Sequence, residues 1–562
     1  MAEGQANGSA NENRSIGISR QVLSIFRKYE KVSPFEIKDK LISLAKRSSR
    51  DSAQAMLNAG RGNPNWVATT PREGFFLLGQ FAMEECKRTM DLPDLGGMPQ
   101  QQGMALRLRT YLDAQNGAPG GSFLRAAVTY AVQRFGFDSD AFVHELVDAI
   151  VGDNYPVPDR MLVHAERVVH EYLAFAMCDN QPPSGKFDLF AVEGGTAAMC
   201  YIFRSLMQNK ILHQGDTIAL GTPIFTPYLE IPHLNDYEFK VVNIHASQEN
   251  RFQFSDKELA KLEDPKVKAF FLVNPGNPSS VAISQPVIDK LVDLVTSKRP
   301  DLIILTDDVY GTFVRGFRSL MAVLPHNTIG VYSYSKYFGC TGWRLGVVAL
   351  HEDNIIDGMI HRLPPKDKAA LHKRYGSLTL EPEKLKFIDR LVADSRDVAL
   401  NHTAGLSLPQ QAQMTLFSLF QLIDQDERYR MSVMKIVSDR VQATLDGLGI
   451  EPELGPLFAA YYGIIDFEFW MRRYGGEEVV QFMKDHYHPL DIVYRLAADH
   501  AMVLLNGGGF DAADWSVRVS FANLDDDVYE DIGRAVRAVA RTYVEAYRFA
   551  AQNGALSKKT KD

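Results

Sequence analysis

Between residues 187 and 350, short apolar runs rich in β-branched side chains alternate with longer stretches of helical periodicity. This alternation predicts a mainly parallel sheet covered by helices, since strands buried on both faces show no polar alternation. Ligands of such sheets gather at the carboxyl ends of the strands, so the polar residues that follow each strand are of most interest. The predicted strands are Phe187–Val192, Thr217–Leu220, Phe239–Ile244, Val267–Val273, Leu302–Leu305, Ile329–Tyr332 and Leu345–Leu350.

The flanking regions differ in pattern from this central part. Residues 406–550 alternate helical stretches with two further predicted strands, Tyr461–Phe467 and Val517–Phe521, which favours a smaller α/β domain that closes on the large one. We therefore predict five segments: 1–66 as an N-terminal part of the small domain, 67–152 as a helical insertion, 153–360 as the large domain, 361–405 as a second helical insertion, and 406–562 as the C-terminal small domain.

Composition and charge narrow the function classes. The chain has 562 residues, of which 46% are hydrophobic, and a formal net charge of -8. This charge argues against a general nucleic-acid or membrane-surface binder, because no basic excess is present to neutralise phosphates. No run of about eighteen apolar residues occurs, and residues 1–15 lack the apolar core of an export signal. Small-molecule chemistry is therefore favoured.

Neither a metal site nor a disulfide framework is predicted. The four cysteines are widely separated and form no C-x-x-C pair, which indicates reduced thiols and a cytoplasmic location. The stretch Asp485–His488 has a metal-like histidine spacing, but no third ligand stands nearby. We interpret this stretch as a surface loop.

The stretch Ser333–Arg344 combines a lysine, a short Ser/Tyr cluster and an arginine eight residues after that lysine. The Lys336 amine can form a Schiff base with an aldehyde, and the Arg344 guanidinium can bind a phosphate dianion. Taken alone this pattern is weak evidence, because an ordinary loop with a solvated lysine can have the same sequence. Its weight comes from the residues that precede it.

Chemistry-bearing residues follow the earlier strands in a regular order. Gly194, Gly195 and Thr196 open a helix after the first strand and can bind a phosphate through backbone N–H groups. Phe225 offers a ring for stacking after the second strand, although a core phenylalanine is the alternative. Asp307, at the end of the fifth strand, can pair with a pyridinium nitrogen and keep it protonated. Their recurrence at successive strand ends is hard to obtain by chance.

The series G-G-T, P-x-F, N-P, D-x-x-Y, S-x-x-K and a following arginine resembles the fold-type I pyridoxal-phosphate enzymes of the aspartate aminotransferase group, over roughly residues 55–525. The resemblance implies pyridoxal 5′-phosphate as cofactor, Lys336 as the catalytic lysine, Asp307 at the ring nitrogen and Phe225 stacked on the ring. It places Asn277 and Tyr310 at the phenolic oxygen. The implied phosphate ligands are Gly194, Gly195, Thr196, Ser333, Arg344 and, from the neighbouring subunit, Tyr155. The implied substrate ligands are Arg518, Asn277 and Gly62.

Two expansions, between Trp66 and Tyr155 and at residues 360–405, together with the overall length, resemble the bacterial aspartate 4-decarboxylases. This resemblance implies β-decarboxylation of L-aspartate to L-alanine and CO2, with some aspartate aminotransferase activity on 2-oxo acids. It also implies homodimers that assemble into a larger homo-oligomer.

The distal carboxylate of aspartate supplies an independent argument. In β-decarboxylation this group leaves as neutral CO2, so a tight arginine clamp would stabilise the ground state more than the transition state. Members of the aspartate aminotransferase group place that arginine just before the position of Pro409, and residues 401–408 contain none. Arg61 and Arg396 are candidate replacements, each with a structural salt bridge as the alternative.

Two rival functions stay open at this point. A plain aminotransferase for aspartate or another amino acid shares every cofactor residue. A non-catalytic pyridoxal-phosphate-binding transcriptional regulator needs a basic helix-turn-helix module, and residues 1–55 are short and weakly patterned for one.

Overall fold

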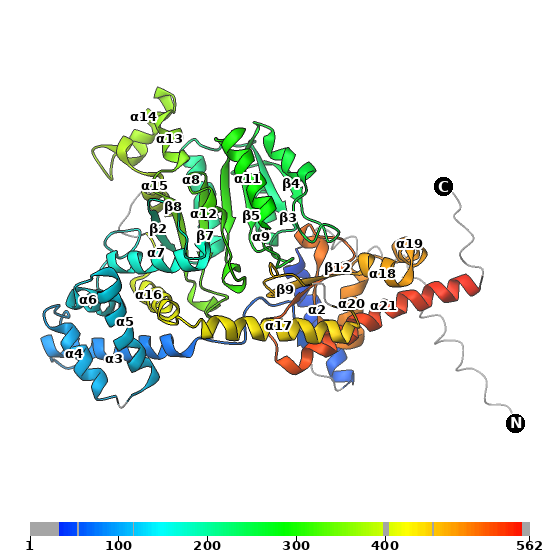
Figure 1. Ribbon diagram of the computed structural model, residues 1–562, viewed down its shortest axis with the longest axis horizontal. Helices are drawn as coiled ribbons and strands as arrows, with labels where there is room; N and C mark the ends of the chain where they lie inside the picture. Colours follow the sequence, from blue (N-terminus) through cyan, green and yellow to red (C-terminus); the bar gives the residue numbers. More distant parts are fainter. Residues whose placement is uncertain (1–32, 53–55, 116, 397–403, 452–453, 554–562) are drawn as a thin grey trace.

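The computed structural model describes residues 33–52, 56–115, 117–396, 404–451 and 454–553, and its centre is a seven-stranded sheet (Figure 1). The strand order is β2-β8-β7-β6-β5-β3-β4. All seven runs predicted from the sequence are strands, with observed bounds that differ from the predicted ones by two residues at most. The strands are β2 (Phe187–Val192), β3 (Thr217–Thr222), β4 (Lys240–His245), β5 (Val267–Val273), β6 (Ile303–Asp307), β7 (Thr328–Ser333) and β8 (Gly346–His351).

The sheet is mainly parallel, as predicted, and β8 is the strand of this sheet that runs antiparallel to both of its neighbours. The chain passes from β7 to β8 through residues 334–345, which contain a short 3-10 turn, η5 (Thr341–Trp343), and no crossover helix. A parallel pair needs such a crossover, so β8 folds back beside β7. The segment that carries Lys336 therefore forms a tight connection at the carboxyl end of β7.

Helices cover both faces of the sheet. On one face, Phe203 of α8 (Gly195–Gln208) packs against Phe271 at a ring-centroid distance of 5.8 Å. On the other face, α11 (Gln285–Ser297) and α12 (Leu320–Val323) share a buried apolar cluster with Phe270. The other helices of this region are α7 (Val163–Cys178), α9 (Thr226–Glu230), η2 (Ile231–His233), α10 (Asp256–Leu259), η3 (Ala260–Glu263), η4 (Gly311–Phe313), α13 (Ile355–His361), α14 (Pro365–Tyr375), η6 (Pro382–Lys384) and α15 (Phe387–Asp394).

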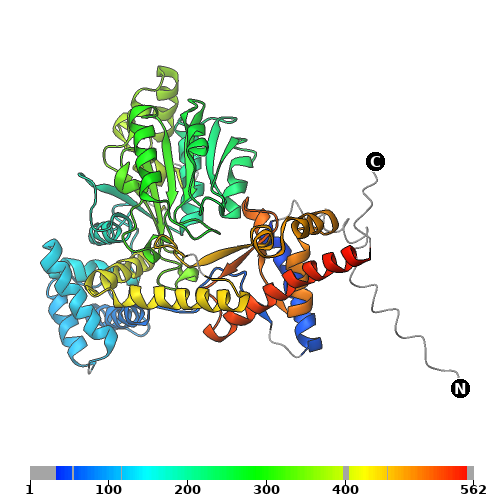
Figure 2. The same ribbon diagram turned by 45° about the vertical axis from the view of Figure 1, so that its right-hand side comes forward.

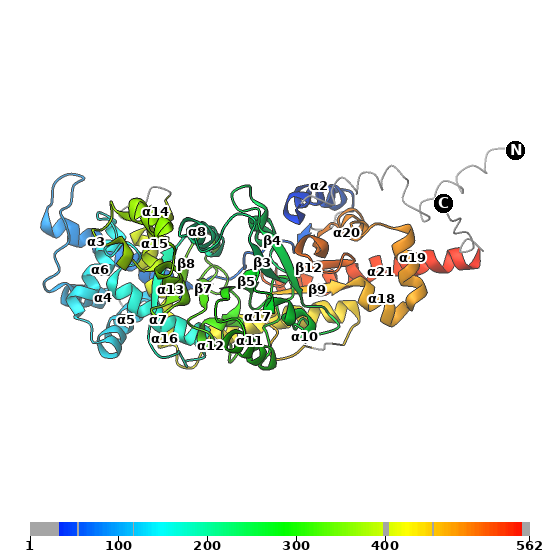
Figure 3. The ribbon, with the colours of Figure 1, turned by 90° about the horizontal axis from the view of Figure 1, so that it is seen from above.

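A helical bundle lies at the end of the molecule opposite to α19 (Glu477–His486) and α21 (Tyr529–Gln552) (Figures 1 and 3). Its helices are α3 (Thr69–Thr89), α4 (Met104–Asp113), α5 (Pro119–Phe135) and α6 (Ser139–Val151). The sequence defines these helices well: the Asp138 carboxylate accepts the Ala141 N–H at 2.8 Å and caps α6, and Gly136 ends α5 in the left-handed region. Helix α16 (Leu408–Ile423) packs against α3, α5, α6 and α7, and so joins the bundle to the large sheet.

The long helix α17 (Arg428–Leu448) leads to a second α/β unit and packs there against α21 (Tyr529–Gln552) (Figure 2). The predicted strands at residues 461–467 and 517–521 correspond to β9 (Tyr462–Asp466) and β12 (Ser516–Ser520), which pair with β11 (Leu505–Asn506) in an antiparallel sheet. A parallel pair, β1 (Leu57–Asn58) with β10 (Met502–Val503), joins distant parts of the chain. The remaining elements are α2 (Pro34–Ser52), α18 (Phe467–Gly475), α19 (Glu477–His486), α20 (Asp491–His500), η7 (Gly507–Phe510) and η8 (Asp526–Val528).

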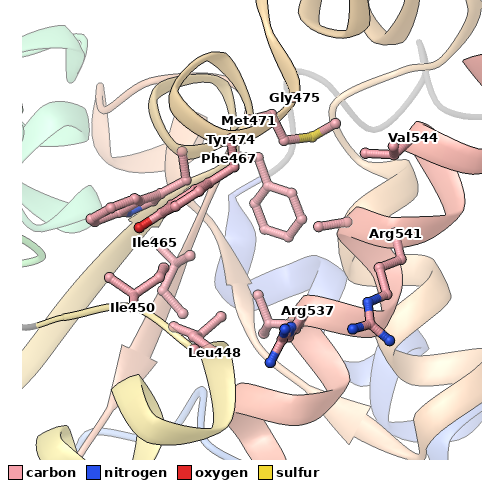
Figure 4. Close-up of a pocket in the computed structure, with 14 residues that line it drawn as sticks. Leu448, Ile450, Ile465, Phe467, Met471, Tyr474, Gly475, Arg537, Arg541 and Val544 are labelled. Atoms are coloured by element: carbon pink, nitrogen blue, oxygen red, sulfur yellow. The ribbon is translucent and has the colours of Figure 1, made fainter.

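An apolar cavity of about 260 Å³ lies in this second unit, lined by Ile465 of β9 and by residues of α18 and α21 (Figure 4). Side chains alternate along a strand, so Ile465 points to the face of β9 opposite to that of Tyr462. The cavity therefore lies behind β9 and is separate from the carboxyl ends of the large sheet. Among the helices formed by the described residues, none is both long and apolar enough to cross a lipid bilayer.

Candidate active site

Lys336 lies in the tight connection after β7 and is half-buried. Its Nζ donates to the carbonyl oxygen of Gly62 at 3.0 Å. The loop that carries Gly62 comes from the N-terminal part of the chain, more than 270 residues away. A side chain at Gly62 would overlap the Tyr462 hydroxyl and would approach Lys336 Nζ to 3.4 Å, so glycine is required where this loop crosses the amine.

Asp307 ends β6 and is buried. The Tyr228 hydroxyl donates to its Oδ2 at 2.7 Å, and the N–H of Val309 donates to its Oδ1 at 3.3 Å. Burial raises the pKa of the Asp307 carboxyl to about 6, although both hydrogen bonds and the positive charge of Lys336 oppose this rise. A cation placed beside this carboxylate would restore its ionised form, which is what the predicted role at a pyridinium nitrogen requires.

The predicted phosphate loop stands where β2 ends and α8 begins. Gly194 has a φ of 93°, a conformation that favours glycine, and a side chain there would come within 2.8 Å of Arg344 Nη2. Arg344 donates from Nη2 to the Glu193 carbonyl oxygen at 2.9 Å. The side chains of Thr196 and Arg344 are exposed beside the N-terminus of α8, a helix of 14 residues whose first N–H groups can bind a phosphate.

Two further predicted ligands lie close to this loop. Gly195 stands at the start of α8, and a side chain there would come within 3.2 Å of Asp307 Oδ2. Ser333 is buried at the end of β7, and its hydroxyl donates to the Leu345 carbonyl oxygen at 3.2 Å. The backbone at the α8 N-terminus therefore lies close to both Asp307 and Arg344, so a group bound there could contact the helix N–H groups and this carboxylate together.

Phe225 follows β3 and is half-buried. Its ring meets the ring of Tyr228 edge to face at 5.3 Å and the ring of Phe35 at 5.8 Å. Tyr310 is buried after β6, and Asn277 Nδ2 donates to its hydroxyl at 3.4 Å. The structure thus places the aromatic residue predicted to stack near Asp307, and it places the two residues predicted to bind the phenolic oxygen in contact with each other.

Arg518 lies on β12 and is 1% exposed. Its Nη1 donates to Asn277 Oδ1 at 3.2 Å and its Nη2 to the Gly60 carbonyl oxygen at 2.9 Å, while its Nε has no hydrogen-bond partner among the described atoms. Burial lowers the pKa of this guanidinium, while the neighbouring tyrosines oppose the change. Among the described residues this cation has no carboxylate partner, and a buried guanidinium of this kind is suited to bind a substrate carboxylate.

The remaining predicted residues are Arg396, Arg61 and Tyr155. Arg396 pairs with Glu193 at 2.9 Å and donates to the Gly405 carbonyl oxygen at 3.1 Å, so the salt bridge weighed as its alternative role is present. Arg61 is exposed next to Gly62, and Tyr155 is 66% exposed. Residues 401–403, part of the stretch without the expected arginine clamp, lie outside the described residues. The described residues contain no group of three or more His, Cys, Asp or Glu that could hold a metal ion.

The sequence did not identify several residues of this site. Tyr228 follows Phe225 by three residues, but no pattern marked it as the partner of Asp307. Tyr462 packs under the Arg518 guanidinium at 4.3 Å from its ring centroid, and Phe35 of α2 lies 5.5 Å from the same guanidinium. Gly60 meets Arg518 across 458 residues of sequence, and no local signal reveals such a contact.

Comparisons with known proteins show that this chain is similar to aminotransferases. Residues 191–365 match the family model described as aminotransferase class I and II. The chain is 47% identical over 525 residues to the bifunctional aspartate aminotransferase and L-aspartate beta-decarboxylase of Pseudomonas sp, covering 93% of this chain and 98% of the relative. An aspartate aminotransferase of Pyrococcus abyssi is 31% identical over 147 residues, which are 25% of this chain and 36% of the relative.

The fold has counterparts among solved structures. The aspartate aminotransferase from Thermus thermophilus with maleate superposes with a TM-score of 0.54 at 14% identity, covering 94% of this chain and 99% of that one. Bna3p of Saccharomyces cerevisiae gives a TM-score of 0.55 at 15% identity, covering 92% of this chain and 98% of that one. At such identities the likeness concerns the fold alone.

Proposed function

The chain belongs to the family of the bifunctional aspartate aminotransferase and L-aspartate beta-decarboxylase of Pseudomonas sp, and we propose that it converts L-aspartate to L-alanine and CO2 with a side activity as an aspartate aminotransferase. The observation that carries this proposal is the meeting of Lys336, Asp307 and Arg518 in a chain that matches this relative along nearly its whole length. Family members use pyridoxal 5′-phosphate.

When bound, pyridoxal phosphate takes up the electron pair that the substrate releases during the reaction. We expect Nζ of Lys336 to hold the cofactor and then to move the proton at the substrate Cα. The Asp307 carboxylate, oriented by the Tyr228 hydroxyl, holds a proton at the ring nitrogen. The Arg518 guanidinium and the Asn277 amide, already in contact, bind the α-carboxylate and fix the substrate beside Lys336.

For the distal carboxylate we favour Arg61 over Arg396. Arg396 already pairs with Glu193, and moving it to a substrate would leave that carboxylate without this partner. Arg61 stands next to Gly62, whose carbonyl accepts the hydrogen bond from Lys336. Its exposed position suits a loose contact that does not hold back the departing CO2.

The family acts on small molecules and forms dimers. We propose that two copies of this chain form a homodimer in which Tyr155 reaches the phosphate of the neighbouring subunit, and that these dimers assemble into a larger homo-oligomer. A cytoplasmic location completes the proposal, and the four unpaired cysteines support it.

The decisive experiment is an incubation of the purified enzyme, loaded with pyridoxal phosphate, with L-aspartate and without any 2-oxo acid. We expect alanine and CO2 in equal amounts over many turnovers. A plain aminotransferase would stop after one turnover per site and would resume on addition of a 2-oxo acid, which would overturn the proposal. Lys336→Ala serves as the blank. Binding of the protein to DNA at moderate salt, without turnover, would favour a regulator instead.

A further inference from the structure

We propose that the Tyr462 hydroxyl donates the proton to the substrate carbon that loses CO2, and that Tyr462 is therefore a catalytic residue of the decarboxylation. This inference rests on the proposed function, because it concerns a step that follows CO2 loss. A plain aminotransferase has no such step.

The first argument is position. Tyr462 starts β9, where its N–H donates to Ser280 Oγ at 2.9 Å and its backbone pairs with Ser520 of β12. Its side chain is 2% exposed and is held by packing. A Cβ atom added to Gly62 would overlap the Tyr462 hydroxyl and lie 3.4 Å from Lys336 Nζ. The hydroxyl and the reactive amine therefore approach the same point of the N-terminal loop.

The second argument is charge. Burial alone would raise the pKa of the Tyr462 phenol, but the positive charges of Lys336 and Arg518 and a hydrogen bond with Tyr310 hold this pKa below its ordinary value. The neighbouring phenols behave differently, since burial raises the pKa of both Tyr310 and Tyr461 well above the ordinary value. The positive charges of Lys336 and Arg518 therefore favour release of a proton from the Tyr462 hydroxyl.

The third argument is the division of labour at the site. The Lys336 amine moves the proton at Cα in the proposed function. The carbon that loses CO2 lies one bond further along the substrate. A second donor therefore relieves the lysine of moving between two carbons. Tyr462 stands on the side of Arg518, whose guanidinium lies 4.3 Å from the Tyr462 ring centroid and which binds the substrate in the proposed function. The Tyr462 side chain thus lies close both to the reactive amine and to the residue proposed to bind the substrate.

The step balances in atoms and electrons. The bond between the β-carbon and the distal carboxylate breaks, CO2 leaves, and the electron pair of that bond stays with the substrate bound to the cofactor. This pair then forms a new C–H bond at the β-carbon with the Tyr462 proton, while the O–H electrons stay on the phenolate oxygen. A proton from solvent restores the phenol, and no oxidant or reductant is consumed.

The test compares Tyr462→Phe with Tyr461→Phe as its matched control. The Tyr461 hydroxyl donates to the Gly62 carbonyl oxygen at 2.9 Å, so the control also removes one hydroxyl from the same loop. In Tyr462→Phe we expect the rate of alanine formation to fall about 100-fold, the usual size of a general-acid contribution. The rate of the single-turnover transamination of aspartate should change by less than about threefold, because Lys336 is the residue proposed to carry its proton transfers.

Two outcomes would overturn the inference: equal losses of both activities in Tyr462→Phe, or the same loss of alanine formation in Tyr461→Phe. Absence of CO2 from the parental enzyme would instead refute the proposed function itself. A second measurement needs no turnover. In cofactor-free protein, absorbance should report one tyrosine that ionises below the ordinary range, present in the parental chain and in Tyr461→Phe and absent from Tyr462→Phe.

If Tyr462→Phe does not fold, a more conservative replacement at the same position tests the inference. Placing 3-fluorotyrosine at position 462 keeps the ring and the hydroxyl but lowers the pKa of the phenol. We expect the alkaline limb of the decarboxylation pH profile to move to lower pH, while the profile of the transamination half-reaction stays in place. If the alkaline limbs of the decarboxylation and transamination profiles moved equally, another group would cause the limb, and the proposal would be overturned.

Discussion

The carboxyl group of Asp307 is buried in the folded chain, and burial raises its pKa to about 6. In an unfolded chain, as in short peptides, the pKa of an aspartate is about 3.9. Because the folded pKa is the higher one, this group stabilises the cofactor-free protein below about pH 4 and loses this contribution as the pH rises through about 6. A difference of about two pKa units corresponds to roughly 3 kcal/mol in the free energy of unfolding.

We therefore predict that Asp307→Asn flattens the fall in melting temperature of the cofactor-free protein between about pH 4 and 7. The measurement is thermal unfolding across this range for the parental chain and the variant. Asp301→Asn is the control, because a hydrogen bond from Arg299 lowers the pKa of Asp301 and its loss should reduce stability at neutral pH. An unchanged pH slope in Asp307→Asn would contradict the prediction. Retention of the cofactor should weaken in this variant at the same time.

The buried guanidinium of Arg518 gives a second prediction. Arg518→Lys should weaken the half-reactions with aspartate and with alanine alike, by about 10- to 100-fold in kcat/KM, because a lysine cannot reproduce two parallel hydrogen bonds to a carboxylate. Pre-steady-state absorbance changes of the cofactor report both half-reactions. A loss confined to aspartate would move Arg518 to the distal carboxylate.

Arg61 and Arg396 form a matched pair for the distal carboxylate. We expect Arg61→Met to reduce the half-reaction with aspartate about tenfold more than that with alanine, since only aspartate carries the second carboxylate. Arg396→Met should reduce both half-reactions to the same degree, through the loss of its ion pair with Glu193. If the two variants exchanged these patterns, Arg396 would be the substrate contact.

How far the sequence predicts single residues depends on how local their signal is. Lys336, Asp307 and Gly194 follow strands closely, so the strand pattern and the resemblance together marked them as candidates. Tyr462 and Gly60 carry no such signal, because they enter the site through contacts between segments hundreds of residues apart. In a sequence, a single tyrosine or glycine cannot be distinguished from an ordinary core residue. Its role becomes visible only when the fold places it beside a charged side chain.

At the scale of elements, the connection between β7 and β8 is fastened to the N-terminal segment. The Ala68 N–H donates to the Phe338 carbonyl oxygen at 3.3 Å, and Trp66 Nε1 donates to the Tyr337 carbonyl oxygen at 3.1 Å. Gly339 has a φ of 63°, and a Cβ atom there would overlap the carbonyl oxygen of Trp66. The two segments therefore approach each other too closely for any side chain at this position.

We predict that Gly339→Ala lowers the free energy of unfolding by about 2 kcal/mol or more, through backbone strain and displacement of the Trp66 segment. Gly342→Ala, three residues further on, is the matched control: no heavy atom lies within 4 Å of its added Cβ, and we expect a change of about 0.5 kcal/mol or less. Urea unfolding of the cofactor-loaded enzyme measures both. Equal stability of the two variants would show that the segments separate without cost.

The long strands were predictable to within two residues because most of their side chains are buried on both faces, which produces apolar runs such as residues 189–192 in β2 and 269–273 in β5. The strands β1, β10 and β11 were not predicted. Each has two residues, and a pair of residues has no periodicity. These short strands exist because of partners elsewhere in the chain.

At the scale of the whole molecule, Tyr155 tests the proposed dimer. Mixed oligomers of Lys336→Ala with Tyr155→Ala should recover sites with parental affinity for the cofactor, because an intact Tyr155 from one subunit completes the site of an intact Lys336 in the other. For random pairing in dimers we expect about a quarter of the parental number of sites. Cofactor titration of the mixture and of each variant alone measures this. No recovery in the mixture would place Tyr155 within its own subunit.

The division of the chain into five segments stays a prediction. The sequence offers no sign that α16, which follows the second predicted insertion, packs against the first one. Helix contacts of this kind depend on which apolar faces meet, and a single sequence with helical periodicity does not specify the partner of a face.

The order of the site residues along the chain has a consequence for biosynthesis. The phosphate loop, Asp307 and Lys336 lie between residues 194 and 344, whereas Arg518 on β12 follows Lys336 by about 180 residues. At translation rates of about 5–20 residues per second, the ribosome adds that stretch in roughly 10–40 seconds. During this interval a nascent chain already contains the residues proposed to bind the cofactor but lacks the arginine proposed to bind the substrate. Cofactor capture can thus precede the ability to consume aspartate, and the cell meets an active enzyme only when the last part of the chain has been made.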